Sequence, residues 1–183
     1  DDFWDGLKNG KSGISAVSRF DASDIASKVA SEINDFDPEK FMDPKEARRN
    51  DRYAQLALAA THLALEDSGL TREDLVPYRT GVIVGSGIGG METIEKQMTT
   101  LIERGPRRVS PFMIPSLIAN IAGGIIAIDL GATGPNFAPV SACASGSHAI
   151  GEAFEMIRRG VADIVFAGLS LIHISEPTRQ QGI

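Results

Sequence analysis

Residues 136–150 read NFAPVSACASGSHAI and give the strongest indication of how this chain is built. A β-prone run ends here, small residues follow, and an amphipathic helical pattern begins directly. This order predicts a tight strand-to-helix turn that holds the chain's only cysteine, Cys143, at the amino end of a helix. Unpaired backbone N–H groups at such an end favour a thiolate, and small neighbours leave the sulfur open to a substrate. The stretch therefore predicts a cysteine nucleophile suited to acyl transfer.

The competing interpretation of Cys143 is structural. A lone cysteine in a protein is most often a small buried hydrophobic residue without chemistry. A core cysteine, however, does not need four small neighbours and a helix that starts beside it. The context therefore favours the nucleophile.

Strands and helices are predicted to alternate around this turn. Upstream lie an apolar strand at 80–84, a helix at 91–104, and a helix that Pro115 opens and that ends near Gly131. Downstream, a buried strand is expected at 161–167. The helix after the cysteine is expected to have five residues on its inner face: Ala149, Ile150, Ala153, Phe154 and Ile157. The alternation predicts a layered α/β fold with a mixed or parallel sheet.

The amino-terminal part carries clear helix signals. Asp43 followed by Pro44 is typical of a helix start, and a longer helix is predicted from about Arg52 to Ser68, where Gly69 ends it. Residues 11–42 are polar and irregular, with strand-like pieces at 14–20 and 27–33, and are expected to cover a surface.

Composition narrows the class of protein. The 183 residues fit one domain, and 43% of them are hydrophobic. A net charge of −6 does not suggest a nucleic-acid or anionic-membrane partner, and no apolar run reaches transmembrane length. One cysteine cannot form an intrachain disulfide, which predicts a reducing, cytoplasmic setting. Without an initiator methionine, the chain is expected to start inside a gene product.

A glycine loop, residues 85–90, offers an alternative function. Gly85, Gly87 and Gly90 satisfy the G-x-G-x-x-G pattern of dinucleotide-binding oxidoreductases. That pattern also requires an acidic residue about twenty positions further on, at the end of a second strand. Here residues 107–111 read RRVSP, without an acid or a strand pattern. The glycines are therefore expected to allow close backbone approach near a site.

Four motifs occur in order along the chain: VGSGIGG at 84–90, VSPFMIPS at 109–116, GPN at 134–136 and SACASG at 141–146. Together they resemble the β-ketoacyl-acyl-carrier-protein synthases, most closely the type II elongating enzyme of fatty acid synthesis. The resemblance covers residues 1–168. It implies a thiolase-like, layered α/β/α fold of two similar halves, of which this chain is the incomplete amino-terminal half.

The resemblance also implies roles for individual residues. Cys143 matches the nucleophile that takes an acyl chain from acyl carrier protein, with its own N–H as one oxyanion-hole donor. Ile88 matches the residue at the mouth of the acyl pocket, which separates long-chain from shorter-chain types. Met113 and Ile114 match positions that reach the partner subunit's pocket in a homodimer. Condensation with malonyl carrier then needs no metal or organic cofactor.

The chain departs from the family in two respects. The family's second half supplies two histidines and a lysine for decarboxylative condensation, and none of His62, His148 and His173 matches them. The chain alone is therefore predicted to be inactive in condensation. Residues 169–183 do not fit the family and are expected to be a non-native tail, similar to a translated sequencing-library adapter. A non-catalytic ketosynthase-like partner subunit remains an alternative, which the presence of Cys143 disfavours.

Overall fold

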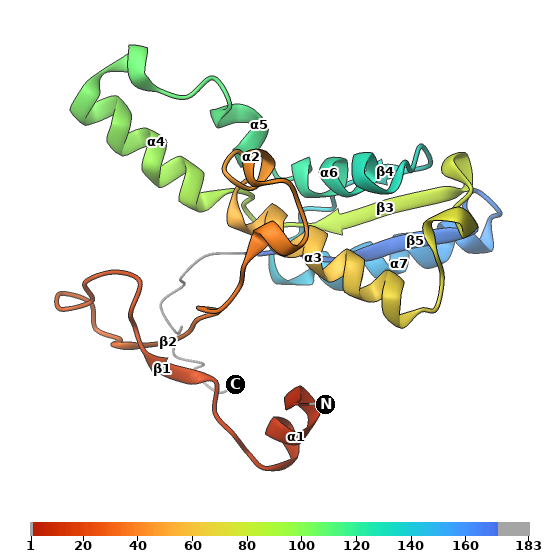
Figure 1. Cartoon of the computed structure of the whole chain (residues 1–183), viewed down its shortest axis with the longest axis horizontal. Helices are drawn as coiled ribbons and strands as arrows, with labels where there is room; N and C mark the ends of the chain where they lie inside the picture. Colours follow the sequence, from red (N-terminus) through yellow and green to blue (C-terminus); the bar gives the residue numbers. More distant parts are fainter. Residues whose placement is uncertain (1, 172–183) are drawn as a thin grey trace. The chain divides into compact units, whose positions relative to one another are not determined.

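The computed structural model describes residues 2–171, which divide after Asp37 into two compact units (Figure 1). The first unit contains helix α1 (Asp2–Lys8) and strands β1 (Ile14–Ala16) and β2 (Val29–Ser31). The two strands pair antiparallel, with Ser15 opposite Ala30. The strand-like pieces predicted for this segment are thus present, but each is only three residues long.

The second unit is built on a three-stranded parallel sheet. Strand β3 (Thr80–Gly85) lies in the centre, between β4 (Asn136–Phe137) and β5 (Ile164–Leu169). Every residue of β3 is buried, as expected for a parallel strand that is covered on both faces. The parallel sheet predicted from the alternation of elements is confirmed.

Helices cover both faces of this sheet (Figure 1). Val82 and Val84 pack with helices α3 (Arg52–Asp67) and α6 (Ile121–Leu130). Ile83, between them in sequence, packs on the opposite face against helix α7 (Ser145–Arg158). Because successive strand residues point to opposite faces, one apolar run supplies both cores. The result is an α/β/α arrangement of three layers.

The helix signals on either side of β3 are confirmed. Helix α2 (Pro44–Ala47) begins after Asp43, whose carboxylate accepts a hydrogen bond from the N–H of Lys45 at 2.8 Å. Helix α3 follows an Asp51 cap and ends before Gly69, which adopts a φ of +71°. Helix α4 (Met91–Arg104) also has its predicted bounds. The remaining short helical turns are η1 (Pro38–Lys40), η2 (Arg72–Asp74), η3 (Pro77–Arg79), η4 (Pro106–Arg108) and η5 (Ala142–Ala144).

The single helix predicted from Pro115 to Gly131 is wrong. Two helices occupy the region, α5 (Met113–Leu117) and α6, and Ile118 between them is extended. The buried Tyr53 hydroxyl donates a hydrogen bond to the Ile118 carbonyl at 2.5 Å, which removes an acceptor that a continuous helix would use. Burial, and secondly the Asp51 carboxylate, raise the pKa of Tyr53, so the phenol keeps the proton that it donates.

The predicted inner face of α7 is right for two of its five residues. Ala149 and Ala153 are buried against the sheet, whereas Ile150, Phe154 and Ile157 are exposed, Phe154 by 64%. The small alanines let the helix lie close to the strands, so its contact stripe is narrow and the larger side chains fall outside it.

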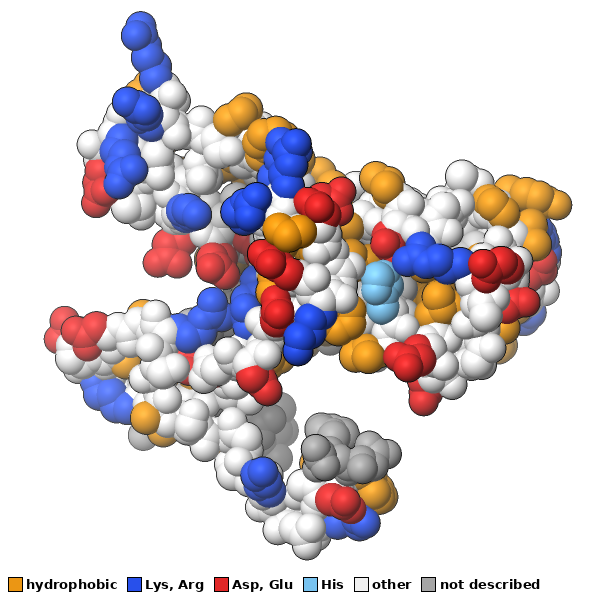
Figure 2. Space-filling model, in the orientation of Figure 1, with side chains coloured by type: hydrophobic (Ala, Val, Ile, Leu, Met, Phe, Trp, Pro, Cys, Tyr) orange, Lys and Arg blue, Asp and Glu red, His pale blue; other side chains and the backbone are white. Residues whose placement is uncertain are grey.

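Two further features bear on the predicted boundaries and surface. Strand β5 continues to Leu169, and Ser170 is buried with its hydroxyl donating to the Tyr53 carbonyl, so ordered packing extends beyond residue 168. Residues 172–183 lie outside the described part of the chain. Despite the net negative charge, Lys and Arg side chains gather at the far end of α4 (Figure 2). Arg104, Arg107 and Arg108 are exposed there.

Candidate functional site: the Cys143 turn

Cys143 lies in η5, directly before α7, and its side chain is exposed with no disulfide partner. The prediction of an exposed thiol at the amino end of a helix is therefore confirmed. The strand that was predicted to lead into Cys143 is shorter than expected. Strand β4 ends at Phe137, and residues 138–141 form an irregular connection to the turn.

The residue before the cysteine has a strained backbone. Ala142 adopts a φ of +50° and is the only non-glycine residue with positive φ between residues 2 and 171. Such a conformation costs about 1 kcal/mol or more for an alanine, and it persists only where its surroundings impose it. Here the fully buried Ser145 imposes it. Its hydroxyl accepts from the Ser141 N–H at 2.9 Å and donates to the Ala142 carbonyl at 2.8 Å.

This turn presents donors as well as a nucleophile. Among the described residues, the N–H of Cys143 has no hydrogen-bond partner. It lies at the amino end of the 14-residue helix α7, where the peptide dipoles leave a partial positive charge. An exposed thiol beside a free N–H at a helix terminus can attack a carbonyl carbon and stabilise the oxyanion that forms.

The glycine loop packs directly on the cysteine turn. A Cβ at Gly85 would lie 2.8 Å from the Ser145 Cβ, and one at Gly87 would lie 3.8 Å from the Ala142 Cα. At its other end, Cβ atoms at Gly89 and Gly90 would approach the carbonyls of residues 117 and 116 to 2.2 and 2.6 Å. The chain's own backbone thus occupies the space that a phosphate would need, which disfavours the dinucleotide alternative and supports the predicted close approach.

The loop and α5 bring the other predicted site residues together. Ile88 is exposed in the loop, and the N–H of Gly90 donates to the Leu117 carbonyl of α5 at 2.9 Å. Helix α5 carries Met113, which is half-buried, and Ile114, which is exposed. Because the same loop contacts the cysteine turn, the segments of all four predicted site residues are adjacent.

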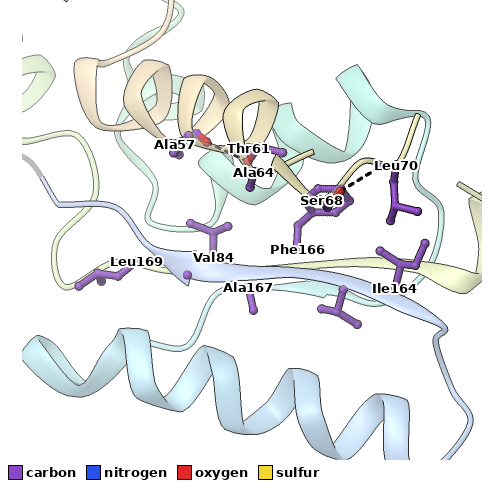
Figure 3. Close-up of a pocket in the computed structure, with 13 residues that line it drawn as sticks. Ala57, Thr61, Ala64, Ser68, Leu70, Val84, Ile164, Phe166, Ala167 and Leu169 are labelled. Atoms are coloured by element: carbon purple, nitrogen blue, oxygen red, sulfur yellow. Dashed lines mark hydrogen bonds between the residues drawn. The ribbon is translucent and has the colours of Figure 1, made fainter. Parts of the chain in front are cut away.

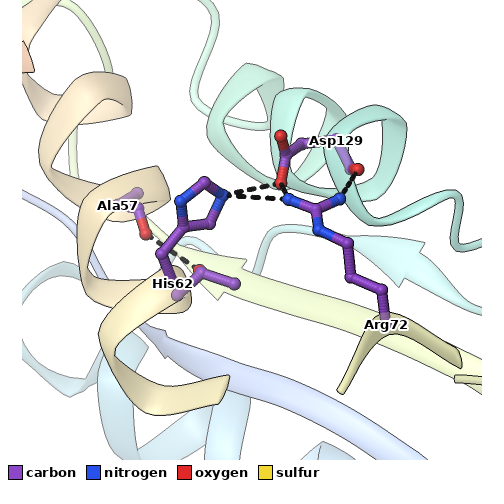
Figure 4. A network of polar contacts seen from close by, with 5 residues as sticks. Ala57, His62, Arg72 and Asp129 are labelled. Atoms are coloured by element: carbon purple, nitrogen blue, oxygen red, sulfur yellow. Dashed lines mark hydrogen bonds and ion pairs between the residues drawn. The ribbon is translucent and has the colours of Figure 1, made fainter. Parts of the chain in front are cut away.

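Neither described histidine makes a hydrogen bond to Cys143. His148 lies with Nδ1 3.2 Å from the Ser141 hydroxyl and Nε2 3.7 Å from Glu152, so it supports the turn. His62 lies with Nε2 2.7 Å from Asp129, which also pairs with Arg72 (Figure 4). His173 lies outside the described residues. Within residues 2–171, no cluster of three acidic, histidine or cysteine side chains is arranged to hold a metal ion, and no helix is long and apolar enough to cross a membrane.

A groove of about 460 Å³ lies elsewhere, between α3 and the face of β5 (Figure 3). Its walls are mainly apolar and include Ala57, Ala64 and Phe166. Thr61 and Ser68 are the polar side chains in its lining, and both hydroxyls donate to carbonyls of α3. The lining of the groove therefore contains no titratable side chain and no residue of the Cys143 turn.

Sequence reasoning missed two residues that shape the site. The sequence identifies Ser145 only as one of the small residues beside the cysteine. The two hydrogen bonds of its hydroxyl depend on the fold of the turn. Asp51 caps α3 and also reaches α4, where its carboxylate accepts from the Thr93 N–H at 2.8 Å. An aspartate directly before a helical pattern signals the first role. The second joins positions far apart in sequence and has no local signal.

Comparison with known proteins gives consistent matches. The model of the β-ketoacyl synthase N-terminal domain matches residues 1–180. The 3-oxoacyl-[acyl-carrier-protein] synthase 2 of Synechocystis sp. is 47% identical over 91% of this chain, and that of Staphylococcus aureus is 46% identical over 90%. The chain spans about 40% of the length of each of these relatives.

Solved structures are also similar. The ishigamide ketosynthase/chain length factor superposes with a TM-score of 0.81 at 28% identity, covering 90% of this chain and 41% of that one. A type II polyketide synthase ketosynthase, solved in complex with its acyl-carrier protein, gives a TM-score of 0.70 at 28% identity, covering 79% of this chain and 42% of that one.

Proposed function

Because the chain belongs to the β-ketoacyl synthase family, we propose that its full-length parent is a 3-oxoacyl-acyl-carrier-protein synthase with Cys143 as nucleophile. One observation carries the proposal: an exposed thiol with a free N–H, held at the amino end of α7 behind the strained Ala142. The names of the relatives support the same activity.

In the first step, the Cys143 thiolate attacks the thioester carbonyl of an acyl carrier. The Cys143 N–H donates to the oxyanion of the tetrahedral intermediate. The carbon–sulfur bond to the carrier then breaks, the carrier leaves as a thiolate, and that thiolate takes up the proton that Cys143 lost. The product is an acyl-enzyme thioester and a free carrier thiol, and no atom is oxidised or reduced.

In the second step, malonyl on another carrier loses carbon dioxide. The electron pair of the broken carbon–carbon bond forms a carbanion, which attacks the acyl-enzyme carbonyl and expels the Cys143 thiolate. The product is a 3-oxoacyl carrier, longer by two carbons. The resemblance assigns this step to two histidines and a lysine of the second half, so we expect the 183-residue chain alone to release no carbon dioxide from malonyl carrier.

We also propose roles for the residues around the cysteine. Ile88 limits the acyl chain at the mouth of the pocket, because its loop contacts the Cys143 turn through Gly87. Met113 and Ile114 extend toward the pocket of a second subunit. The exposed face of α4 supports such a homodimer. Its exposed large hydrophobic side chains are Met91, Met98, Leu101 and Ile102, and no residue of the helix is fully buried.

Acyl carrier protein is the proposed partner, and the cytoplasm is the proposed location. The carrier is supported by the solved complex of a similar ketosynthase with its acyl-carrier protein. The domain proposal remains that residues 1–168 are the amino-terminal half and that residues 169–183 are non-native. The source gene beyond codon 168 tests it: a continuation different from residues 169–183, with histidine-containing motifs downstream, is expected.

The function is tested with the full-length parent. The protein is incubated with acyl carrier, digested and examined by mass spectrometry, and the acyl mass is expected on the peptide that contains Cys143. Cys143→Ser is expected to lose at least about a hundredfold in acyl transfer while its thermal unfolding is unchanged. Acylation at another residue, or full activity of the serine variant, would contradict the proposal.

A further inference from the structure

Asp51 holds two helices with one buried carboxylate. The residue is only 5% exposed. One oxygen, Oδ1, accepts from the N–H of Tyr53 at 3.3 Å in the first turn of α3. The other, Oδ2, accepts from the N–H of Thr93 at 2.8 Å in the first turn of α4. A carboxylate stabilises the amino end of a helix through both hydrogen bonds and the dipole, and here it does so for two helices.

The Asp51 carboxylate packs closely against the end of the glycine loop. A Cβ at Gly90 would lie 2.8 Å from Oδ2 of Asp51, so the loop backbone lies directly on the carboxylate. Gly90 is the last residue before α4 and is two positions from Ile88. The place of Ile88 therefore depends on where Asp51 anchors the start of α4.

The backbone just before Asp51 holds the second pocket segment. The Ser116 hydroxyl donates to the Arg49 carbonyl at 2.6 Å, and the Arg49 guanidinium lies 4.5 Å from the centre of the Phe112 ring. Both contacts fix α5, which carries Met113. Residues 49–51 thus contact the two segments, the Ile88 loop and α5, that the proposed function assigns to the acyl pocket.

We propose that Asp51 is a positioning residue for acyl-chain selectivity, because it fixes the Ile88 loop against α5. The proposal rests on the proposed function, and it assigns to Asp51 no contact with substrate. An asparagine at this position keeps one acceptor oxygen but can no longer accept from both N–H groups. Alanine loses both. The loop should then shift, while the Cys143 turn keeps its own Ser145 bonds.

The experiment compares Asp51→Asn and Asp51→Ala with unmodified full-length parent. The rate of Cys143 acylation is measured with hexanoyl and hexadecanoyl carrier, and the rate of Cys143 alkylation with iodoacetamide. We expect the ratio of the two acylation rates to change by about fivefold or more in Asp51→Ala and by less in Asp51→Asn. Alkylation should stay within about twofold in both. Asp43→Asn is the matched control, because Asp43 caps only the short α2.

The outcomes separate the two proposals. If both acylation rates fall equally in the folded variants and their ratio is unchanged, Asp51 is only structural and the inference is overturned. Asp51→Asn provides the same readout if Asp51→Ala does not fold. If the unmodified parent is not acylated by either carrier, the proposed function itself fails, and this inference fails with it. An altered ratio in Asp43→Asn would also overturn it, since the effect would not be specific to the α3–α4 contact.

Discussion

The side chains that cover the two faces of the central sheet are buried to different degrees. On the α3 and α6 face, large side chains are fully enclosed, and Tyr53 and Ile126 are 0% exposed. On the α7 face, alanines are buried, while the large residues of the same helix lie open. The first face has an enclosed core around Tyr53 and Ile126, although a groove stays open between α3 and β5. On the second face, only the layer between α7 and the sheet is buried, and the outer side of α7 is exposed.

Polar contacts differ in the same way. On the first face, Asp129 of α6 pairs with His62 of α3 and with Arg72, so helices are joined across the surface (Figure 4). The ion pairs that the described residues of α7 make stay within the helix or reach its end at Arg159. Among the described residues, no ion pair therefore joins α7 to another helix. Since the relatives are more than twice as long, the difference predicts that the parent covers α7 with another part of its chain.

The largest expected effect tests the closed face. Ile126→Ala should destabilise the chain by about 3 kcal/mol, because it leaves a cavity against Val82 and Val84. Ile128→Ala, two residues further along α6 and 83% exposed, should change stability by less than about 0.5 kcal/mol. Urea denaturation of both variants measures the difference. Equal effects would show that this face is not a closed core.

The second test concerns the open face. Phe154→Ala should change the stability of the 183-residue chain by less than about 0.5 kcal/mol, because the ring is exposed. In the full-length parent, the same substitution should cost about 3 kcal/mol, if the ring is buried there. Ile128→Ala in both backgrounds is the control. A similar small effect of Phe154→Ala in both would break the comparison, because the α7 face would then be a true outer surface.

These two faces also show what the sequence could predict. Strand β3 and helices α3 and α4 followed from caps, glycines and apolar periodicity, which are all local signals. The exposed thiol at the start of α7 followed from its small neighbours in the same way. The thiolase-like half-fold, expected from four motifs, is confirmed by the structural similarity to ketosynthases.

The sequence-based predictions fail where a residue far away in the sequence determines the local structure. Tyr53 ends the helix that the pattern around Pro115 predicts, and it comes from a helix 65 positions away. The width of the buried stripe on α7 depends on how closely its alanines approach the sheet. The second hydrogen bond of Asp51 depends on the start of α4. None of these has a signature within one window of sequence.

A smaller effect should separate the polar contacts of the two faces. Asp129→Asn should cost about 1 kcal/mol, because it weakens a partly buried network between α3 and α6. Glu155→Gln should cost about 0.3 kcal/mol, because its partners Arg158 and Arg159 lie on its own exposed helix surface. Thermal unfolding at pH 7 distinguishes them. A larger cost for Glu155→Gln would reverse the comparison.

The smallest expected effect concerns the residues directly before β3 and β5, at one end of the sheet. Arg79, before β3, donates to both oxygens of Asp163, before β5, at 2.9 and 2.5 Å. These hydrogen bonds, with a smaller contribution from the opposite charge, hold the pKa of Asp163 below its usual 3.8. The ionised carboxylate is therefore favoured by folding. Its contribution is present above the unfolded pKa and is lost as the pH falls through the lower folded value.

Asp163→Asn should accordingly show a weaker loss of stability than the unmodified chain as the pH falls below about 4. The two should differ by a constant amount above about pH 5. Glu103→Gln, which removes an exposed carboxylate on α4 without an ion pair among the described residues, is the control for the loss of one negative charge. Urea midpoints between pH 2.5 and 6 give the comparison. Parallel profiles for Asp163→Asn and the unmodified chain would mean that the pair does not hold the strands together, and both faces would then rest on side-chain packing and backbone pairing alone.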